Sequence, residues 1–211
     1  MGTNFYARII PTKKRRKEIA DLILKSNDFN KITKEVLNTF GTINYEYDEQ
    51  TYLGGVIHLG KRSYGWKFLW NPNHYKIEHG HLETIKKEDG REEYKWIEEP
   101  YTVFKYYDLT KKSLKKFICR KDVEIYDEYG EKQDNKEFFN MALNWTTYIN
   151  ADGKTVEAYD GSTYHEKDGG KHIYPLTEYG RFIKELGYKV NESNSDFFSD
   201  GLRFATCTDF S

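Results

Sequence analysis

The segment around Gly60 to Gly65 has the residue types best suited to binding, because cationic, hydroxyl and aromatic side chains are concentrated there. Four glycines between residues 54 and 65 separate two short apolar runs, a pattern typical of two strands joined by a loop. We expect the loop, residues 60–65, to offer charge-assisted hydrogen bonds to a phosphate, a carboxylate or a protein surface. The candidate binding residues are His58, Gly60, Lys61, Arg62, Ser63, Tyr64, Gly65 and Lys67.

The same segment is similar to a phosphate-binding loop but lacks two of its parts. Gly55 to Lys61 reads Gly-x-x-x-x-Gly-Lys, but Arg62 stands where the magnesium-binding Ser or Thr is required. The following residues alternate as in a strand, whereas a phosphate-binding loop works at the N-terminus of a helix. We therefore do not expect hydrolysis of a nucleoside triphosphate.

Three histidines could contribute to a metal site. They are His74, His79 and His81, and on a strand the last two would direct their imidazoles to one face, as zinc binding requires. The sequence fixes no third ligand nearby. It therefore favours histidines that are solvated or hydrogen-bonded, and we expect no metal ion and no cofactor.

Glu93 and Lys95, with Asp89 upstream, have the spacing that metal-dependent nucleases use to hold Mg²⁺ and position a water. In so charged a chain this spacing also arises by chance, and Asp89 lies at an expected hairpin turn. The sequence contains no recognisable Ser-His-Asp or Cys-His set. We expect no catalytic residues and a protein that is not an enzyme, with a metal-dependent nuclease as the least favoured alternative.

The composition describes a folded chain without a global charge. The 211 residues carry 33 Lys plus Arg against 34 Asp plus Glu, so no overall field attracts nucleic acid or an anionic membrane. Aromatic residues make up 17%, including 18 tyrosines, which is more than a core of this size needs and favours a partner-binding surface or a homodimer seam. No apolar run is long enough to span a membrane.

Hydrophobic periodicity and turn signals predict an α+β fold with a mainly antiparallel sheet, several hairpins and separated amphipathic helices. We expect one domain, residues 1–211, with a helical insertion at about 12–40 and a hairpin at 54–70. Capping residues predict helix starts, and Asp-Gly pairs predict hairpin turns. The caps are Thr12, Thr110, Asp134 and Thr177, and the turns lie at Asp89-Gly90 and Asp152-Gly153.

If four of the expected strands pair in one sheet, the two ends of the chain meet the glycine-rich segment. These strands are the opening strand 3–10, strand 56–59, strand 66–70 and the closing strand 202–208. Within the third of these, Trp66, Phe68 and Trp70 fall on one face and are expected to face the core.

Scattered blocks of the chain resemble uncharacterised small proteins of bacteriophages and prophages. Members of that family begin Met-Gly-Thr-Asn-Tyr-Tyr, contain His-Ile-Gly-Lys-Ser-Ser-Gly-Gly-Trp and end in a Gly-Glu-Phe-Ser-like tail. The matching blocks here are Met1–Tyr6, His58–Trp66 and Thr208–Ser211, with a further similarity at Asp127–Gly130. Family members often have a cysteine pair after the opening strand, and this chain has its helical stretch there, so no metal site is carried over.

The resemblance implies a phage accessory protein that acts in the cytoplasm of an infected bacterium. We expect a non-enzymatic inhibitor that binds a host protein of a defence system through its tyrosine-rich surface and residues 60–65. The alternative is a protein that binds nucleotides or nucleic acid, with Lys61 and Arg62 on phosphate and an exposed aromatic ring on a base.

Overall fold

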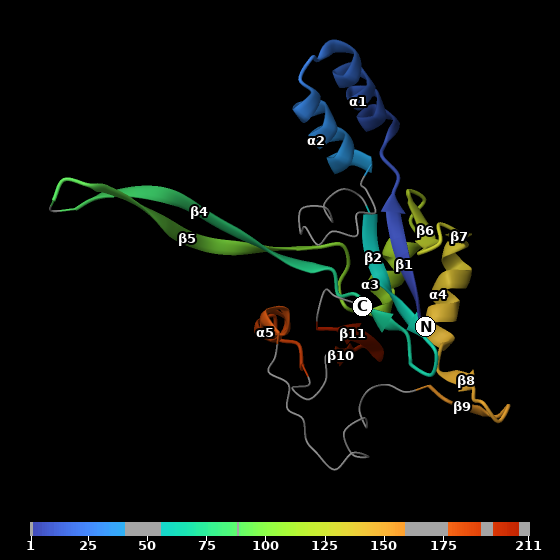
Figure 1. The fold of residues 1–211 in the computed structure, drawn as a ribbon. Helices are drawn as coiled ribbons and strands as arrows, with labels where there is room; N and C mark the ends of the chain where they lie inside the picture. Colours follow the sequence, from blue (N-terminus) through green and yellow to red (C-terminus); the bar gives the residue numbers. More distant parts are fainter. Residues whose placement is uncertain (1, 41–55, 88, 159–176, 191–195, 207–211) are drawn as a thin grey trace. The chain divides into compact units, whose positions relative to one another are not determined.

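The computed structural model describes residues 2–40, 56–87, 89–158, 177–190 and 196–206 (Figure 1). Gly54, Gly55 and the tail Thr208–Ser211 lie outside these residues. The chain divides into two compact units, residues 73–106 and the remainder. The secondary structure confirms the α+β class, with mainly antiparallel strands joined by hairpins.

A seven-stranded sheet forms the centre of the larger unit, in the order β10-β11-β3-β2-β1-β6-β7. Its strands are β1 (Gly2–Ile9), β2 (Val56–Ser63), β3 (Leu69–Trp70), β6 (Val123–Asp127), β7 (Lys132–Gln133), β10 (Asp196–Ser199) and β11 (Leu202–Ala205). All neighbouring strands are antiparallel except β11 and β3, which are parallel. The opening, second, third and closing strands do lie in this one sheet, but the third is shorter than the expected residues 66–70 and covers only Leu69–Trp70.

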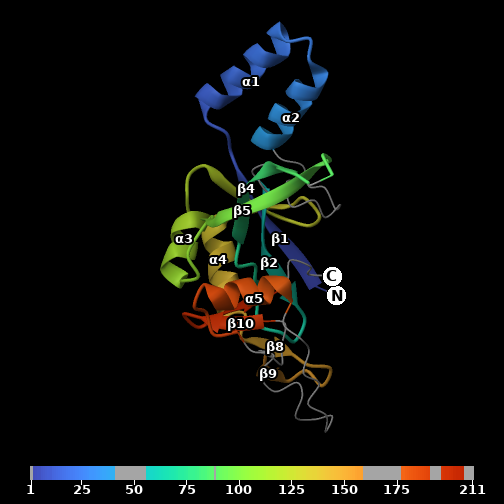
Figure 2. The same ribbon diagram turned by 90° about the vertical axis from the view of Figure 1, so that its left-hand side faces the viewer.

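The core of this unit lies between the sheet and two helices, α3 (Lys111–Ile118) and α4 (Asn135–Asn144) (Figure 2). Phe138 of α4 packs against Phe5 of β1 and Trp70 of β3, with ring centroids 4.9 and 6.1 Å apart. Phe68 completes this aromatic group at 4.5 Å from Trp70. Phe68 and Trp70 are buried as expected, whereas Trp66 is only half-buried.

The expected caps begin the helices where the sequence places them. Asp134 accepts hydrogen bonds from the backbone N–H groups of Lys136 and Glu137 at the start of α4. Thr177 accepts from Gly180 at the start of α5 (Glu178–Glu185). Each cap satisfies an N–H group that has no partner within the helix.

Two further helices, α1 (Lys13–Lys25) and α2 (Phe29–Phe40), form an antiparallel pair after β1. Thr12 caps α1, and Arg15 binds Glu35 of α2 with a nitrogen–oxygen distance of 2.6 Å.

A short hairpin follows α4 in the larger unit and consists of β8 (Thr147–Ile149) and β9 (Thr155–Glu157).

The smaller unit is a long two-stranded hairpin of β4 (His74–Lys86) and β5 (Glu92–Lys105), whose strands flank the expected turn at Asp89-Gly90. A bulge lies between Ile77 and His79, opposite Pro100, whose missing N–H group is tolerated there. Three aromatic rings, those of Tyr75, Phe104 and Tyr106, pack together near its open end.

The expected loop at residues 60–65 is wrong in its bounds. β2 continues to Ser63 and pairs with β1, because Gly2 to Phe5 lie opposite Ser63 to Gly60. Gly60 is therefore a strand residue inside the sheet, and a Cβ atom there would lie 2.2 Å from the carbonyl oxygen of Leu69. The glycine allows this close approach of the two strands.

Candidate functional site

The sequence-predicted binding residues divide between the interior and the surface. His58 and Gly60 are buried within β2, and the His58 ring stacks on Tyr6 with centroids 5.0 Å apart. Burial lowers the pKa of His58 from 6.5 to about 4, so the imidazole is neutral at pH 7. Lys61, Ser63 and Lys67 are half-buried, as are Arg62 and Gly65, and only Tyr64 is exposed.

Arg62 and Tyr64 meet two aromatic residues that follow α4. The guanidinium of Arg62 lies over the ring of Trp145 at 3.7 Å from its centroid. Tyr64 contacts Tyr148 edge-on, with centroids 5.0 Å apart, and donates a hydrogen bond to the carbonyl oxygen of Ile149. We call these four residues, Arg62, Tyr64, Trp145 and Tyr148, the Arg62 cluster.

The local backbone holds the Arg62 cluster in place. The Trp145 indole N–H lies 3.4 Å from the carbonyl oxygen of Ser63, and the N–H of Trp66 donates to the same oxygen at 3.2 Å. Gly65 has a φ angle of 81°, which allows the sharp turn after β2. Arginine stacked on tryptophan beside tyrosine is the composition typical of binding hot spots at protein interfaces.

A second arginine–tryptophan pair lies at Trp66. The guanidinium of Arg203 in β11 lies 5.0 Å from the centroid of the Trp66 ring. The same guanidinium forms an ion pair with Asp196 of β10, and the two charged side chains are only 9% and 4% exposed. Arg203 is also 3.3 Å from the carbonyl oxygen of Lys67, so its charge is compensated within the chain.

The candidate metal ligands are not assembled into a site within the part of the chain that the structure describes. His79 is hydrogen-bonded to Thr102 and His81 to Glu99, each at 2.9 Å. Both contacts join neighbouring strands of the β4–β5 hairpin. No group of three or more His, Cys, Asp or Glu side chains that could hold a metal ion occurs in the described residues.

The candidate nuclease residues form surface ion pairs on the same hairpin. Glu93 binds Lys87 at 2.7 Å, and Asp89 binds Arg91 at 2.6 Å in the turn. Arg91 holds the pKa of Asp89 below its usual value. The two carboxylates thus each pair with a different cationic side chain, and the spacing of these residues reflects surface ion pairs of the hairpin.

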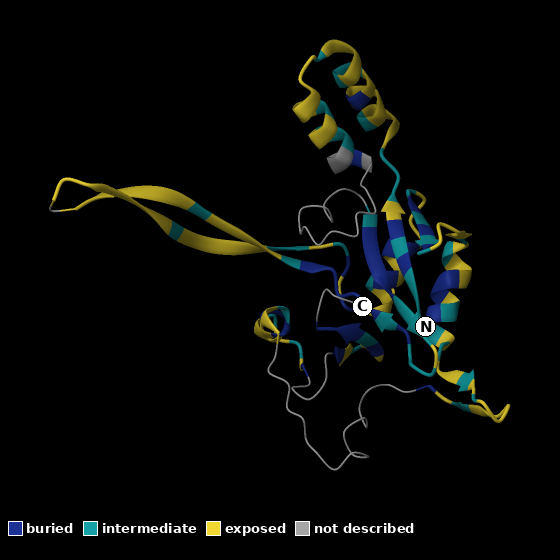
Figure 3. Ribbon diagram, viewed as in Figure 1, coloured by how far each residue is buried: buried dark blue, intermediate teal, exposed yellow. Residues whose placement is uncertain are grey.

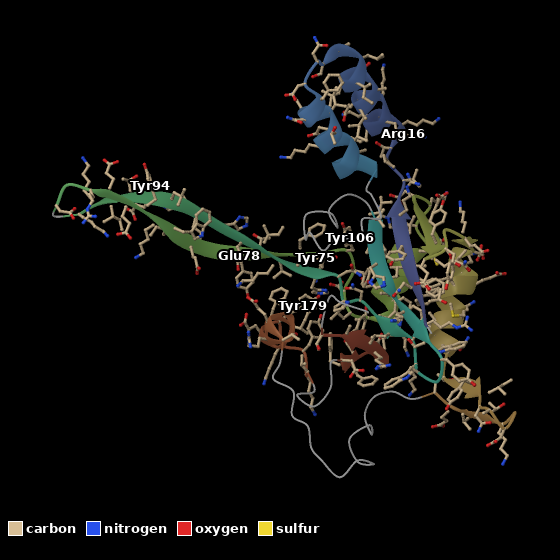
Figure 4. All side chains as sticks on the ribbon, in the orientation of Figure 1. Arg16, Tyr75, Glu78, Tyr94, Tyr106 and Tyr179 are labelled. Atoms are coloured by element: carbon tan, nitrogen blue, oxygen red, sulfur yellow. The ribbon has the colours of Figure 1, made fainter. Side chains whose placement is uncertain are left out.

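The β4–β5 hairpin has an apolar face that sequence reasoning missed. Leu82 lies directly opposite Trp96, and Tyr94 lies two residues further along the same face. Their side chains are 64%, 52% and 67% exposed, in that order. Figure 3 shows that exposed residues line both strands, and Figure 4 places Tyr94 towards the turn and Glu78 nearer the open end.

The sequence contains the signal for this face, namely period-two alternation of residues 92–98 opposite Gly80 to Lys86. Trp96 packs over Gly80, because a Cβ atom at that glycine would lie 2.5 Å from the indole ring. The opposite face contains Ile85 and Ile97 among charged residues. We call Leu82, Tyr94 and Trp96 the hairpin stripe.

Comparison with models of protein families, with curated proteins and with solved structures gave no match. Among the helices in the described residues, none has the length and apolar character needed to cross a membrane. Two surfaces of the described residues, the Arg62 cluster and the hairpin stripe, have the composition of binding sites.

Proposed function

We propose that this protein is a non-enzymatic binding protein whose hairpin stripe docks into an apolar groove of a protein partner. The observation that carries the proposal is the exposure of Leu82, Tyr94 and Trp96 side by side on one face of the β4–β5 hairpin. Burial of large aromatic side chains away from water is strongly favourable, so leaving them exposed is costly in free energy. Exposed apolar patches of this kind mark interaction surfaces.

The hairpin also constrains the charge of its partner. Between Glu78 and Glu99 the sequence has eight carboxylates and four Lys or Arg residues, a net charge of −4. This charge repels a second copy of the same hairpin and favours a groove with a basic rim. A two-stranded ribbon is marginally stable by itself, so a partner that covers the stripe would also stabilise the strands.

We further propose that the partner is a host protein of a bacterial defence system and that this chain inhibits it in the cytoplasm of an infected cell. This step rests on the resemblance of residues 1–6 and 58–66 to phage and prophage proteins. Inhibition by occupation of a groove requires no catalytic group, in agreement with the ion-paired state of Glu93 and Asp89.

Capture of the partner from infected cells tests this function. The tagged wild-type chain is compared with a variant carrying Leu82→Ala, Tyr94→Ala and Trp96→Ala. Ile85→Ala is the matched control, because Ile85 is an exposed apolar residue on the opposite face of the hairpin. We expect the triple variant to lose the partner, and Trp96→Ala alone to weaken binding about 30-fold, the effect of a hot-spot residue worth roughly 2 kcal/mol.

Retention of the same partner by the triple variant, with circular dichroism unchanged, would refute docking through the hairpin stripe.

The dependence of affinity on salt concentration distinguishes this function from the nucleic-acid alternative. Affinity for a protein groove should change only modestly between 50 and 200 mM salt, whereas a polymer of phosphates would lose orders of magnitude.

A further inference from the structure

The larger unit contains two arginines that each lie over a tryptophan ring, and they differ in whether a carboxylate pairs with the guanidinium. Arg203 lies over Trp66 and is ion-paired with Asp196. Arg62 lies over Trp145, closer to the ring than Arg203 is to its own. The Arg62 side chain forms no hydrogen bond and no ion pair with any other described residue, so among these residues a carboxylate pairs with Arg203 and none pairs with Arg62.

Arg62 is also partly removed from water. It is half-buried, and burial lowers the pKa of its guanidinium. Arginine keeps its charge in proteins under all ordinary conditions, so partial burial leaves a cation that has lost hydration. Among the described residues, contact with the indole face of Trp145 offsets part of that loss. An anion placed at the edge of the guanidinium would restore that lost stabilisation through charge-assisted hydrogen bonds.

The stacking prepares Arg62 for this role. The guanidinium lies 3.7 Å from the centroid of the Trp145 ring, which restricts its movement, and Trp145 is itself positioned by the carbonyl oxygen of Ser63 at the end of β2. Stacking occupies the face of a guanidinium and leaves the donors at its edge available, which is the geometry for bidentate binding of a carboxylate. Little side-chain entropy remains to be lost when an anion binds.

We propose that Arg62 binds a carboxylate of the protein partner. This ion pair between two molecules would correspond to the pair that Arg203 forms with Asp196 within the chain. The source of the carboxylate, an Asp or Glu side chain of a protein, rests on the proposed function. The site itself, an oxyanion position at the edge of the Arg62 guanidinium, rests only on the geometry of the Arg62 cluster.

A carboxylate fits this surface better than a nucleic acid does. Arg62 already covers one face of Trp145, and the Tyr64 hydroxyl is used by Ile149, so the cluster has its best stacking face occupied. Nucleic acids are bound by several cations that follow successive phosphates, and the net charge of −1 gives no such field. One fixed arginine among tyrosines instead matches an acidic anchor on a protein.

The test observes the Nε–H signals of Arg62 and Arg203 by nuclear magnetic resonance in the full-length chain. The Arg62 signal is assigned by its loss in Arg62→Lys. The probe is a capped peptide of six glutamates, titrated at constant ionic strength against a capped peptide of six glutamines. We expect the glutamate peptide to shift the Arg62 signal in a saturable manner and the glutamine peptide to leave it unchanged.

Arg203 is the internal control, because Asp196 already occupies its guanidinium. An Arg62 signal that does not move, or that moves no more than that of Arg203, would overturn the proposal. Inorganic phosphate titrated at the same ionic strength forms a further arm. A shift at lower concentrations of phosphate than of the glutamate peptide would overturn the assignment to carboxylate.

The same titration separates this inference from the proposed function, since it needs neither a host partner nor the hairpin stripe. Once a partner is captured, Arg62→Lys should reduce its affinity about tenfold, because lysine keeps the charge but loses the planar pair of donors. Lys112→Ala, at an exposed lysine of α3, is the matched charge control and should leave the affinity unchanged. Equal affinities of Arg62→Lys and wild type would refute a contact at this position.

Discussion

Protonation of the buried His58 should destabilise this protein as the pH falls below 6.5. The imidazole is 6% exposed in the middle of β2, and burial lowers its pKa from 6.5 to about 4. The neighbouring Lys61 charge lowers the pKa further, while a backbone hydrogen bond to Gly60 acts in the opposite direction. In the unfolded chain, by contrast, the imidazole is in water and has its ordinary pKa.

The sign and size of the effect follow from these two pKa values. Above pH 7 the imidazole is neutral in both states and its contribution to stability is complete. Below pH 6.5 the unfolded chain binds a proton that the folded chain accepts only near pH 4, so the free energy of unfolding falls. The loss is about 2 kcal/mol at pH 5 and about 3 kcal/mol at pH 4, out of a typical total of 5–15 kcal/mol.

Urea unfolding at pH 7, 6 and 5 measures this loss, and His79→Gln serves as the control for an exposed histidine. His58→Gln, which cannot be protonated, should lose about 2 kcal/mol less than wild type between pH 7 and 5. Because a buried substitution can impair folding, the Cε1–H signal of His58 is also titrated in the wild-type protein. A titration midpoint near 6.5 would refute the reasoning.

Three further substitutions test the packing, each by urea unfolding at pH 7. Gly60→Ala should cost at least about 3 kcal/mol, since its Cβ atom would meet the Leu69 carbonyl oxygen; a loss below 1 kcal/mol would show that the strands separate easily. Asp196→Ala should cost about 3–5 kcal/mol by leaving the charge of Arg203 buried, and a neutral result would contradict the buried ion pair. Asp134→Ala should cost about 1 kcal/mol through loss of the α4 cap, with no change expected in the slope against urea.

The helix starts and hairpin turns could be predicted because their causes are local. Thr12, Thr110 and Asp134 each accept a hydrogen bond from a backbone N–H group three residues later. The turn at Asp152-Gly153 likewise depends on a left-handed glycine, with a φ angle of 75°. Interactions of this range are visible in any window of a few residues.

The extents of the strands could not be predicted in the same way. Glycines at 60 and 65 favoured a loop, but pairing of β2 with β1 extends the strand to Ser63 and leaves only the turn near Gly65. In the β4–β5 hairpin, Pro100 and the charged residues weaken the strand pattern, although the pairing continues through a bulge to Lys105. Hydrogen bonds between distant residues here outweigh local preference.

The sequence by itself determined the class of fold, the capped starts of the helices and the burial of Phe68 and Trp70. Only the tertiary structure decided that His58 is a neutral interior residue, that Arg62 lies on Trp145, and that the hairpin stripe is exposed. The physical reason is the separation along the sequence over which each effect acts. Local preferences act between residues a few positions apart, whereas burial and stacking depend on which distant segments the sheet brings together.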